Sequence, residues 1–304
     1  MRLRLNSKAI MIMTLICFVW GLQQVAIKAA EKEVSLTLQI AMRSGLAALV
    51  IYVYAKIKGE KFSMEKMTLF AGVCAGVLFA LEFFFLSEGL RYSSASHMAV
   101  LLYTAPLYSA VGLHIFSAEE KLTARQWFGV MIAFFGLVVS MINTVAHAGF
   151  DSINYGDLCG LLAGLAWGCT TVVIRTTPLS VCSAKQTLLY QLSGAFIILM
   201  TISLFNDGYH FKPGTVAYGS LIFQTLIVSV ISYLVWFSLL RNYQVASLSM
   251  LTFMTPFFGI LSGIIILHEK VQANFIAGTV LLIIGLLFIT VKTHQQHSKN
   301  KSVK

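Results

Sequence analysis

The sequence predicts an all-α integral membrane protein with ten transmembrane helices, arranged as two inverted five-helix repeats whose N and C termini are both cytoplasmic. The first observation is the composition, because 58% of the residues are hydrophobic and only 11% are charged, which lies outside the range of soluble domains. The second is that apolar runs of about 20 residues, long enough to cross a bilayer core, recur from residue 9 to residue 291. The third is that motifs of the first half return in the second half in the same order.

Taken in order, the apolar runs of the first half predict helices over residues 9–30, 36–55, 68–89, 95–116 and 127–146. Those of the second half predict helices over residues 156–177, 185–205, 215–239, 244–267 and 273–291. The first run is longer than the apolar region of a signal peptide, and no Ala-x-Ala-like cleavage site follows it. We therefore interpret it as a retained helix.

The lysines and arginines set the expected orientation. With both termini in the cytoplasm, most of the 22 basic residues lie on the cytoplasmic side, as the positive-inside rule requires. The exceptions are Lys28, Lys32, Arg91, Lys212 and Lys270 on the outer side, and Arg43 within a helix. The net charge of +10 is therefore a sign of topology and of contact with anionic lipid, and it does not indicate a nucleic-acid partner. Residues 292–304 form a basic tail that we expect in the cytoplasm.

Two blocks of sequence carry the internal repeat. The segment "FVWGLQQVAIK" of the first predicted helix matches "LAWGCTTVVIR" of the sixth, so Trp20 and Gly21 correspond to Trp167 and Gly168. The segment "LRYSSASHMAVLLYTAP" has the same length as "LRNYQVASLSMLTFMTP", and each ends in a proline. Further along, the alignment of the two halves pairs two more sets of glycines, Gly129 with Gly278 and Gly136 with Gly285.

These matches define two units within one helical bundle. We expect a first repeat at residues 1–148, holding helices one to five, and a second at residues 149–291, holding helices six to ten. Because each repeat has an odd number of helices, the second copy enters the membrane from the opposite side. Inverted repeats of this kind are typical of secondary transporters, which bind their substrate near the middle of the membrane.

The motifs resemble those of the drug/metabolite transporter superfamily, specifically its EamA type. That family has a Trp-Gly in the first helix, an Ala-Leu-x-Tyr-x-x-Ala stretch followed by a proline, and a Gly-Glu-x-Leu-like turn before the fifth helix. The segments that correspond here are "FVWGL", "EGLRYSSAS" and "AEEKL" in the first half, and "LAWGC", "SLLRNYQVAS" and "HEKV" in the second. The chain departs from the pattern in two details, since Glu88-Gly89 replaces the usual Ala-Leu and neither Glu-Lys turn has its preceding glycine.

The resemblance implies a multi-pass protein of the bacterial inner (cytoplasmic) membrane that exports small metabolites such as amino acids, with no cofactor. Other members of the superfamily carry sugar phosphates, nucleotide sugars or cationic drugs. From the residues, a strongly anionic phosphate would require several buried basic groups, whereas Arg43 is the only one deep in a predicted helix. A zwitterionic or amphipathic solute fits better. One chain supplies both repeats, so a monomer is sufficient, and a dimer is an open alternative.

The candidate substrate-binding residues are aromatic, amide and hydroxyl side chains near the middle of the membrane. Trp20, Gln24 and Lys28 form one stripe of the first helix, because residues four apart share a face. The full set comprises Trp20, Gln23, Gln24, Tyr103, Trp167, Thr170, Thr171, Tyr233 and Thr252. The alternative is that the tryptophans fill core space, while Lys28 and Arg175 extend to the two membrane interfaces.

Two charges and two prolines complete the candidate site. Arg43 and Glu82 are the only charges deep within predicted helices, and a charge exposed to hydrocarbon is costly. We therefore expect either an ion pair between them or a Glu82 that carries a coupling proton; their counterparts in the second repeat are uncharged. Pro106 and Pro256 each remove a helical hydrogen bond, so they are candidate hinges, with fixed kinks as the alternative.

The class of function follows from these features. The sequence has no nucleophile elbow, no His-Glu-x-x-His and no phosphate loop, so we expect no enzymatic activity. Five cysteines without a Cys-x-x-Cys pair indicate no metal site. The prediction is a secondary transporter that works by alternating access on a small-molecule substrate in the lipid bilayer, either proton-coupled or facilitative. A channel, or an accessory or receptor membrane protein, is the alternative.

Overall fold

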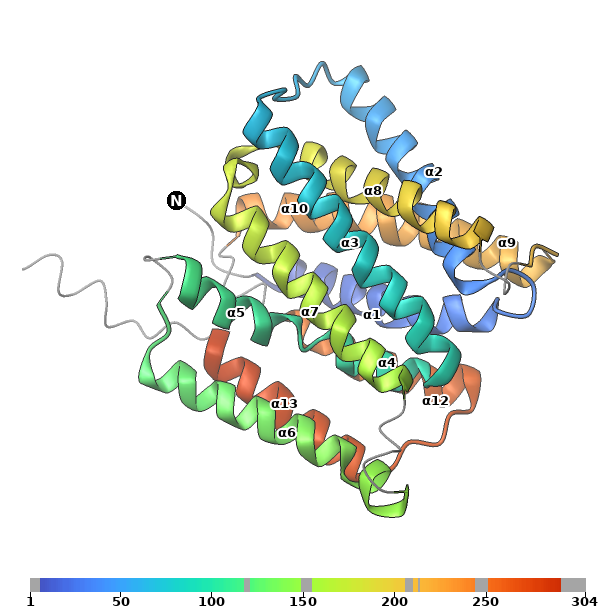
Figure 1. Cartoon of the computed structure of the whole chain (residues 1–304), viewed down its shortest axis with the longest axis vertical. Coiled ribbons are helices and arrows are strands. Elements are labelled where there is room, and N and C mark those ends of the chain that lie inside the picture. Colours follow the sequence, from blue (N-terminus) through green and yellow to red (C-terminus); the bar gives the residue numbers. More distant parts are fainter. Residues whose placement is uncertain are drawn as a thin grey trace, which may run out of the picture.

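The computed structural model describes residues 6–117, 121–148, 155–205, 210–212, 214–243 and 251–290. Within these ranges the architecture is helical, and an isolated β-bridge joins Val34 to Phe211. The tail at residues 292–304 and the first part of the predicted helix at 244–267 lie outside the described residues. Figure 1 shows the helices gathered into one bundle.

The helices of the first half are α1 (Ser7–Ala29), α2 (Leu36–Ile57), α3 (Lys66–Tyr92), α4 (Ala95–Leu102), α5 (Ala105–Phe116) and α6 (Ala124–Ala148). The predicted helix at 95–116 is therefore two helices, separated by a turn at Tyr103 and Thr104. Pro106 in the first turn of α5 explains the break, because proline cannot donate the hydrogen bond that would continue the helix.

The second half contains α7 (Tyr155–Thr176), the 3₁₀-helix η3 (Pro178–Val181), α8 (Ala184–Phe205), α9 (Thr215–Ile222), η4 (Phe223–Ser232), α10 (Tyr233–Asn242), α12 (Met254–Leu267) and α13 (Ala273–Thr290). The predicted helix at 215–239 is continuous, but its middle segment η4 is a π-helix of 10 residues. The π form is rare and concentrated at functional sites. Pro256 lies in the first turn of α12, as Pro106 does in α5.

Among the described residues, seven helical segments are long and apolar enough to cross a membrane: Ser7–Ala29, Leu36–Ile57, Lys66–Tyr92, Ala95–Phe116, Tyr155–Thr176, Ala184–Phe205 and Thr215–Trp236. Three shorter apolar helices, Ala124–Ser140, Met254–Leu267 and Ala273–Ile289, lie at the remaining predicted positions. The protein therefore has the architecture of a multi-pass membrane protein. Ten complete spans and cytoplasmic termini stay predictions.

The centre of the bundle is built around α3. This helix packs along α7 and α8, while α2 packs along α8 and α1 along α12 (Figure 1). The largest buried apolar cluster joins these elements and includes Ile40, Phe83, Met98 and Leu192. The apolar packing holds the polar side chains of the interior at fixed positions.

The helices α6 and α13 form a close pair at one edge of the molecule (Figure 1). A Cβ atom added to Gly136 would lie 2.7 Å from the carbonyl oxygen of Gly278, and one added to Gly278 would lie 2.4 Å from that of Gly136. Gly129 and Gly285 approach each other in the same way, at 2.7 and 2.6 Å. Since the partner's number falls as the residue number rises, the helices are antiparallel. Small residues permit this close approach.

Candidate functional site

The two Trp-Gly motifs pack against the two proline-containing helices in the same manner. A Cβ atom added to Gly21 of α1 would lie 2.7–2.9 Å from atoms of three α12 residues, Thr255, Phe258 and Gly259. One added to Gly168 of α7 would lie 2.7–3.2 Å from the same kinds of atoms in three α5 residues, Ala105, Tyr108 and Ser109. The alignment that places Pro106 on Pro256 pairs these neighbours one by one, so the two motifs occupy equivalent surroundings.

Each tryptophan of these motifs holds one tyrosine. The indole Nε1 of Trp20 donates a hydrogen bond to Ser232 Oγ at 2.7 Å, and its ring meets Tyr233 edge to face at 6.0 Å between centroids. Trp167 meets Tyr103 in a similar T-shaped contact at 5.3 Å. Both tryptophans are half-buried. The predicted aromatic residues of the site therefore form two pairs, and each pair joins one residue of the first half to one of the second half.

Arg43 and Glu82 are both buried in the bundle, with 1% and 4% of their surfaces exposed. The guanidinium lies over the ring of Phe83, with Cζ 4.3 Å from the ring centroid. Its Nε and Nη1 atoms have no hydrogen-bond partner in the protein, and neither has Glu82 Oε2. The two side chains lie within electrostatic range of each other. A direct ion pair was the first of the two arrangements expected from the sequence. These atoms of Arg43 and Glu82 do not form one.

Two tyrosines lie beside these charges. Tyr233, at the start of α10, is within electrostatic range of both Arg43 and Glu82. Tyr103, at the turn between α4 and α5, is within range of Glu82 and Tyr233 and is 4% exposed. We call Arg43, Glu82, Tyr103 and Tyr233 the central cluster. It brings a cation, an anion and two hydroxyl groups together from both halves of the chain.

The buried amides extend the polar interior along α1, α2 and η4. Gln23 and Gln24 are 5% and 3% exposed, and Gln24 Oε1 has no partner. Two further amides, Gln39 and Gln224, are fully buried, and the Gln224 amide nitrogen donates to Gln39 Oε1 at 3.3 Å and to Ser220 Oγ at 2.7 Å. Sequence reasoning missed Gln39 and Gln224. The signal was present, because each is a primary amide within an apolar run, as in the pair from α1.

Other predicted residues are satisfied locally. The hydroxyl groups of Thr170 and Thr171 donate to carbonyl oxygens of their own helix, those of Ala166 at 2.9 Å and Trp167 at 3.1 Å. Thr252 is half-buried, two residues before the start of α12. Lys28 donates to the Leu90 carbonyl at the end of α3 and pairs with Glu31 at 3.0 Å. Thr170, Thr171 and Lys28 therefore have partners in the protein, in contrast to the unpaired atoms of Arg43 and Glu82.

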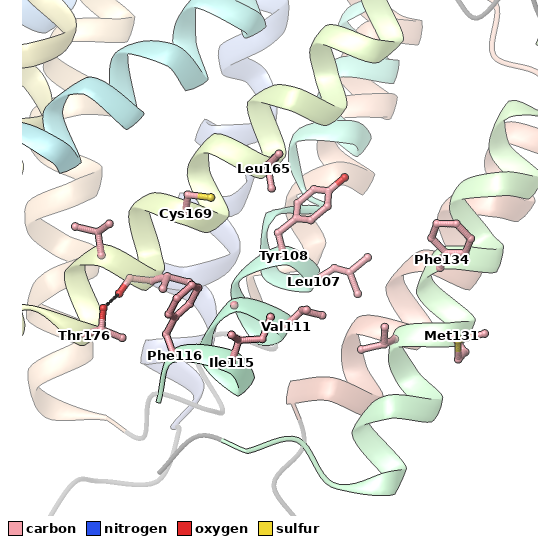
Figure 2. Close-up of a pocket in the computed structure, with 14 residues that line it drawn as sticks. Leu107, Tyr108, Val111, Ile115, Phe116, Met131, Phe134, Leu165, Cys169 and Thr176 are labelled. Carbon is pink, nitrogen blue, oxygen red and sulfur yellow. Dashed lines mark hydrogen bonds between the residues drawn. The ribbon is translucent and has the colours of Figure 1, made fainter. Parts of the chain in front are cut away.

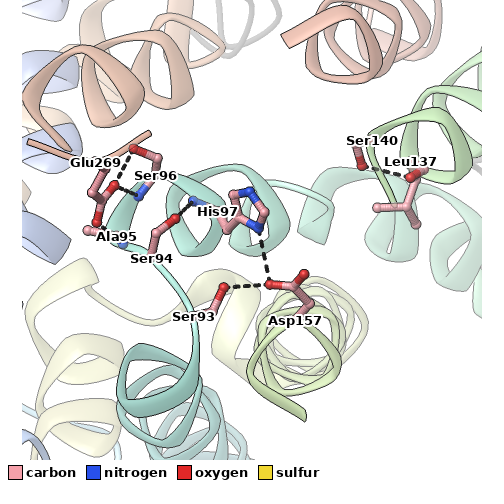
Figure 3. Close-up of polar contacts among 9 residues, drawn as sticks. All are labelled: Ser93, Ser94, Ala95, Ser96, His97, Leu137, Ser140, Asp157 and Glu269. Atoms are coloured by element: carbon pink, nitrogen blue, oxygen red, sulfur yellow. Dashed lines mark hydrogen bonds and ion pairs between the residues drawn. The ribbon is translucent and has the colours of Figure 1, made fainter. Parts of the chain in front are cut away.

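A carboxylate caps the start of α4 from a distant part of the chain (Figure 3). Glu269 accepts hydrogen bonds from the Ala95 amide at 2.7 Å and from the amide and hydroxyl of Ser96 at 2.9 and 2.5 Å. His268 makes the turn that brings Glu269 there, because its φ of 54° is left-handed. The carboxylate satisfies amides that a helix leaves free at its N-terminus and complements the helix dipole.

A second polar contact joins α4 to α7. His97 Nδ1 lies 3.3 Å from Asp157 Oδ1, which also accepts a hydrogen bond from Ser93 at 2.5 Å (Figure 3). The imidazole ring also stacks on Phe275 of α13, with 4.0 Å between the ring centroids. Although carboxylates and a histidine gather here, the described ranges contain no group of three or more His, Cys, Asp or Glu side chains that could hold a metal ion. The contacts join helices.

Two apolar grooves flank the bundle, and each has a volume of about 740 Å³. The first lies between α5, α6 and α7, where Tyr108, Phe134 and Leu165 contribute to its walls (Figure 2). The second lies between α2, α3 and α8. The predicted substrate-binding residues line neither groove. Their apolar walls suit lipid acyl chains, so the polar interior remains the candidate site for a solute.

Comparison with known proteins identifies the family. The profile of the EamA-like transporter family matches residues 7–142 and residues 154–291. The uncharacterized transporter YoaV of Bacillus subtilis is 25% identical over 276 residues, which are 90% of this chain and 94% of that protein. Two proteins named probable amino-acid metabolite efflux pump, from Salmonella typhimurium and Escherichia coli, are 24% and 23% identical over 90% of this chain and 91% of each pump.

A solved crystal structure shows the same fold. Its chain is 16% identical in sequence and superposes with a TM-score of 0.63, covering 94% of this chain and 98% of its own length. The family and the names of the relatives indicate a membrane transporter and not an enzyme. The two matched ranges include the whole central cluster, and together they span most of the sequence, so the chain belongs to the EamA-like transporter family.

Proposed function

We propose that this protein is a secondary transporter that exports amino acids or related zwitterionic or amphipathic metabolites across the cytoplasmic membrane by alternating access. The observation that carries the proposal is the central cluster, where charged atoms of Arg43 and Glu82 are buried without a protein partner. Burying an unpaired charge is costly. In membrane proteins such charges mark the pathways of substrates and ions, so the cluster has the character of a binding site.

The glycine contacts support two inverted repeats as the moving units. Gly129 contacts Gly285, and Gly136 contacts Gly278, while the alignment pairs Gly129 with Gly278 and Gly136 with Gly285. The contact is therefore reciprocal, which is the property of an interface on a two-fold axis. Because α6 and α13 are antiparallel, that axis lies in the membrane plane if both helices cross the membrane. Repeats related in this way rock about a central site.

The substrate class is supported by two observations. Two relatives are named as amino-acid metabolite efflux pumps. The central cluster also offers one cation and one anion, a balance that suits a zwitterion better than a phosphorylated or a purely cationic solute. The carriers of those other solutes within the superfamily are the alternatives to be tested.

Counterflow in proteoliposomes tests transport itself. The purified protein is reconstituted, the vesicles are loaded with one unlabelled amino acid, and uptake of the same labelled amino acid is measured over a range of external concentrations. We expect saturable uptake that internal solute stimulates, because a carrier returns faster when it is loaded. Vesicles without protein and vesicles with the Arg43→Gln and Glu82→Gln double variant serve as controls. Uptake that internal solute does not stimulate, for every solute tried, would contradict a carrier and favour a channel.

A further inference from the structure

The central cluster has a donor side and an acceptor side that do not satisfy each other. Arg43 contributes two donor nitrogens without a protein partner, Nε and Nη1, and Glu82 contributes the acceptor Oε2. Both side chains are more than nine-tenths buried, on the neighbouring helices α2 and α3. They attract each other electrostatically, yet these atoms remain unpaired. A ligand that carries both charges on one small framework would pair with both sides at once.

We propose that this site binds a free α-amino acid, with Arg43 holding the α-carboxylate and Glu82 holding the α-ammonium group. The inference rests on the proposed transport function and specifies the chemistry that the central cluster recognises. A guanidinium presents planar N–H donors that bind a carboxylate at more than one point. A carboxylate accepts the hydrogen bonds of an ammonium group, which has donors only. An α-amino acid carries these two groups on a single carbon atom.

Charge balance argues against phosphorylated and purely cationic solutes as ligands of this site. The described groups within electrostatic range of Arg43 and Glu82 are each other and the two tyrosines of the cluster. With Arg43 and Glu82 both ionised, their two charges balance, and a zwitterion keeps that balance. A phosphate ester would bring further negative charge beside Glu82, and an organic cation would bring positive charge beside Arg43. Either excess charge would be buried without a partner, which is costly.

The surroundings also restrict the side chain of the amino acid. The guanidinium of Arg43 rests on Phe83, and the tyrosines of the cluster are held by Trp20 and Trp167. Phe83 contacts the guanidinium and the two tyrosines lie within electrostatic range of Glu82, so aromatic rings lie near both charges. A neutral, apolar or aromatic side chain would bury its surface there without leaving a charge unpaired. Leucine and phenylalanine are therefore the substrates with which the inference is tested.

The first test uses the wild-type protein and needs no variant. Counterflow of labelled leucine is measured in proteoliposomes in competition with unlabelled leucine, with isoamylamine, which lacks the carboxylate, and with 4-methylpentanoate, which lacks the ammonium group. We expect both analogues to compete at least about tenfold more weakly than leucine, because each leaves one buried charge unpaired. The same comparison is made for phenylalanine with phenethylamine and 3-phenylpropanoate.

The second test exchanges the preference between the two analogues. Arg43→Gln removes the need for a carboxylate, so this variant should lose the discrimination against isoamylamine and keep that against 4-methylpentanoate. Glu82→Gln should do the reverse. Ser44→Ala is the matched control, because Ser44 is equally buried in α2 and bonds only to the Ile40 carbonyl of its own helix at 2.7 Å. A merely structural role for Arg43 or Glu82 would lower transport of all the solutes alike.

The outcomes separate this inference from the proposed function. Absence of counterflow for every solute in the wild-type protein would overturn the transport proposal. Robust counterflow of some solute together with equal competition by isoamylamine, 4-methylpentanoate and leucine would leave transport intact and overturn the α-amino acid site. Transport of other solutes with no competition by leucine or phenylalanine would also overturn it. If the single variants do not fold, as judged by gel filtration in detergent, the wild-type analogue series alone decides.

Discussion

Arg43 and Glu82 occupy places that the second half of the chain gives to uncharged side chains. The counterpart of Glu82 is Ser232, which accepts the hydrogen bond of Trp20 at 2.7 Å. A serine in that position is satisfied by a tryptophan and by the Val228 carbonyl of its own helix at 2.6 Å. Glu82, in the equivalent position of α3, has a carboxylate oxygen, Oε2, without a hydrogen-bond partner. The difference between the halves therefore lies in what each leaves available to a solute.

The carboxyl group of Glu82 also offers a test of whether the proposed transport is proton-coupled or facilitative. The groups that face it are Arg43, Tyr103 and Tyr233. We expect that an imposed pH gradient changes the uptake of the wild-type protein, because a buried carboxyl group at the binding site can take up or release a proton between the two open states. In Glu82→Gln the response should be lost, since the amide cannot be protonated at these pH values.

The measurement compares uptake in vesicles with equal and unequal internal and external pH, using for each protein a solute that it still exchanges. Ser44→Ala should keep the response of the wild-type protein. A Glu82→Gln protein with an undiminished response to the gradient would rule out Glu82 as the proton carrier and leave the facilitative mode, or another group, to be considered.

The identity of the buried charges could be predicted from the sequence, but their pairing could not. Arg43 and Glu82 stand out because charges are rare in apolar runs. Whether they touch depends on side-chain directions across α2 and α3, and there the guanidinium lies over Phe83. Gln39 and Gln224 were not among the predicted site residues, because an uncharged amide lowers the hydropathy of an apolar run less than a charge does. Their shared hydrogen bond joins α2 to η4, two elements far apart in the sequence.

The broken and widened helices show how local chemistry shapes this bundle. Pro106 and Pro256 each lie in the first turn of a helix, and the π-helix η4 leads directly into Tyr233. The prolines predicted interruptions in the two spans. The π-helix has no comparable signal in the sequence; its residues pack against α1 and α2. Three irregular segments therefore adjoin the central cluster or the motifs that surround it.

The close approach of α6 and α13 makes a stability prediction. Gly278→Ala places a Cβ atom 2.4 Å from the Gly136 carbonyl oxygen and from the Ser140 amide nitrogen, so the helices must separate. We expect a destabilisation of about 1–3 kcal/mol, seen as a lower melting temperature in detergent. Gly219→Ala is the matched control, because a Cβ there meets nothing within 4 Å. Equal melting temperatures for the two variants would show that α6 and α13 do not pack this closely.

The capping of α4 by Glu269 makes a second prediction at the level of helices. Glu269→Gln replaces a charged acceptor of three hydrogen bonds with a neutral one, so α4 should lose about 1 kcal/mol of stabilisation. Glu65→Gln provides the comparison, since Glu65 is a glutamate at the N-cap of α3 whose side chain makes no capping hydrogen bond. The melting temperature should fall for the first variant only. A fall of the same size in both would assign the effect to net charge.

More of the fold than of the candidate site could be predicted from the sequence. Composition and apolar run length placed the helices within a few residues of their observed bounds, apart from the helix predicted at 244–267, whose first part lies outside the described residues. The placement succeeds because about 20 apolar residues have few other stable environments. The family followed from short motifs that the profile match bears out. The arrangement of helices was less accessible, since contacts such as α3 with α7 or α6 with α13 depend on glycine positions whose partners no single helix reveals.

The expected topology can be tested with two cysteines placed at opposite ends of the bundle. In a variant whose native cysteines are replaced by alanine, Ser180→Cys lies in η3 and Lys212→Cys lies before α9, and both positions are exposed. We expect a membrane-impermeant maleimide to label Ser180→Cys only in inverted vesicles and Lys212→Cys only in intact cells. Labelling of both from the same side would contradict inverted repeats with cytoplasmic termini.

The reciprocal glycine contacts between α6 and α13 also bear on ancestry. Under two inverted repeats, each half makes with the other the contacts that two separate half-length chains would make as an antiparallel dimer. Such an ancestor had to insert into the membrane in both directions, so its lysines and arginines could not favour one side. The present bias of basic residues would then be younger than the gene fusion that joined the halves. That fusion would also have freed one half to acquire Arg43 and Glu82 without a duplicate pair of charges in the other.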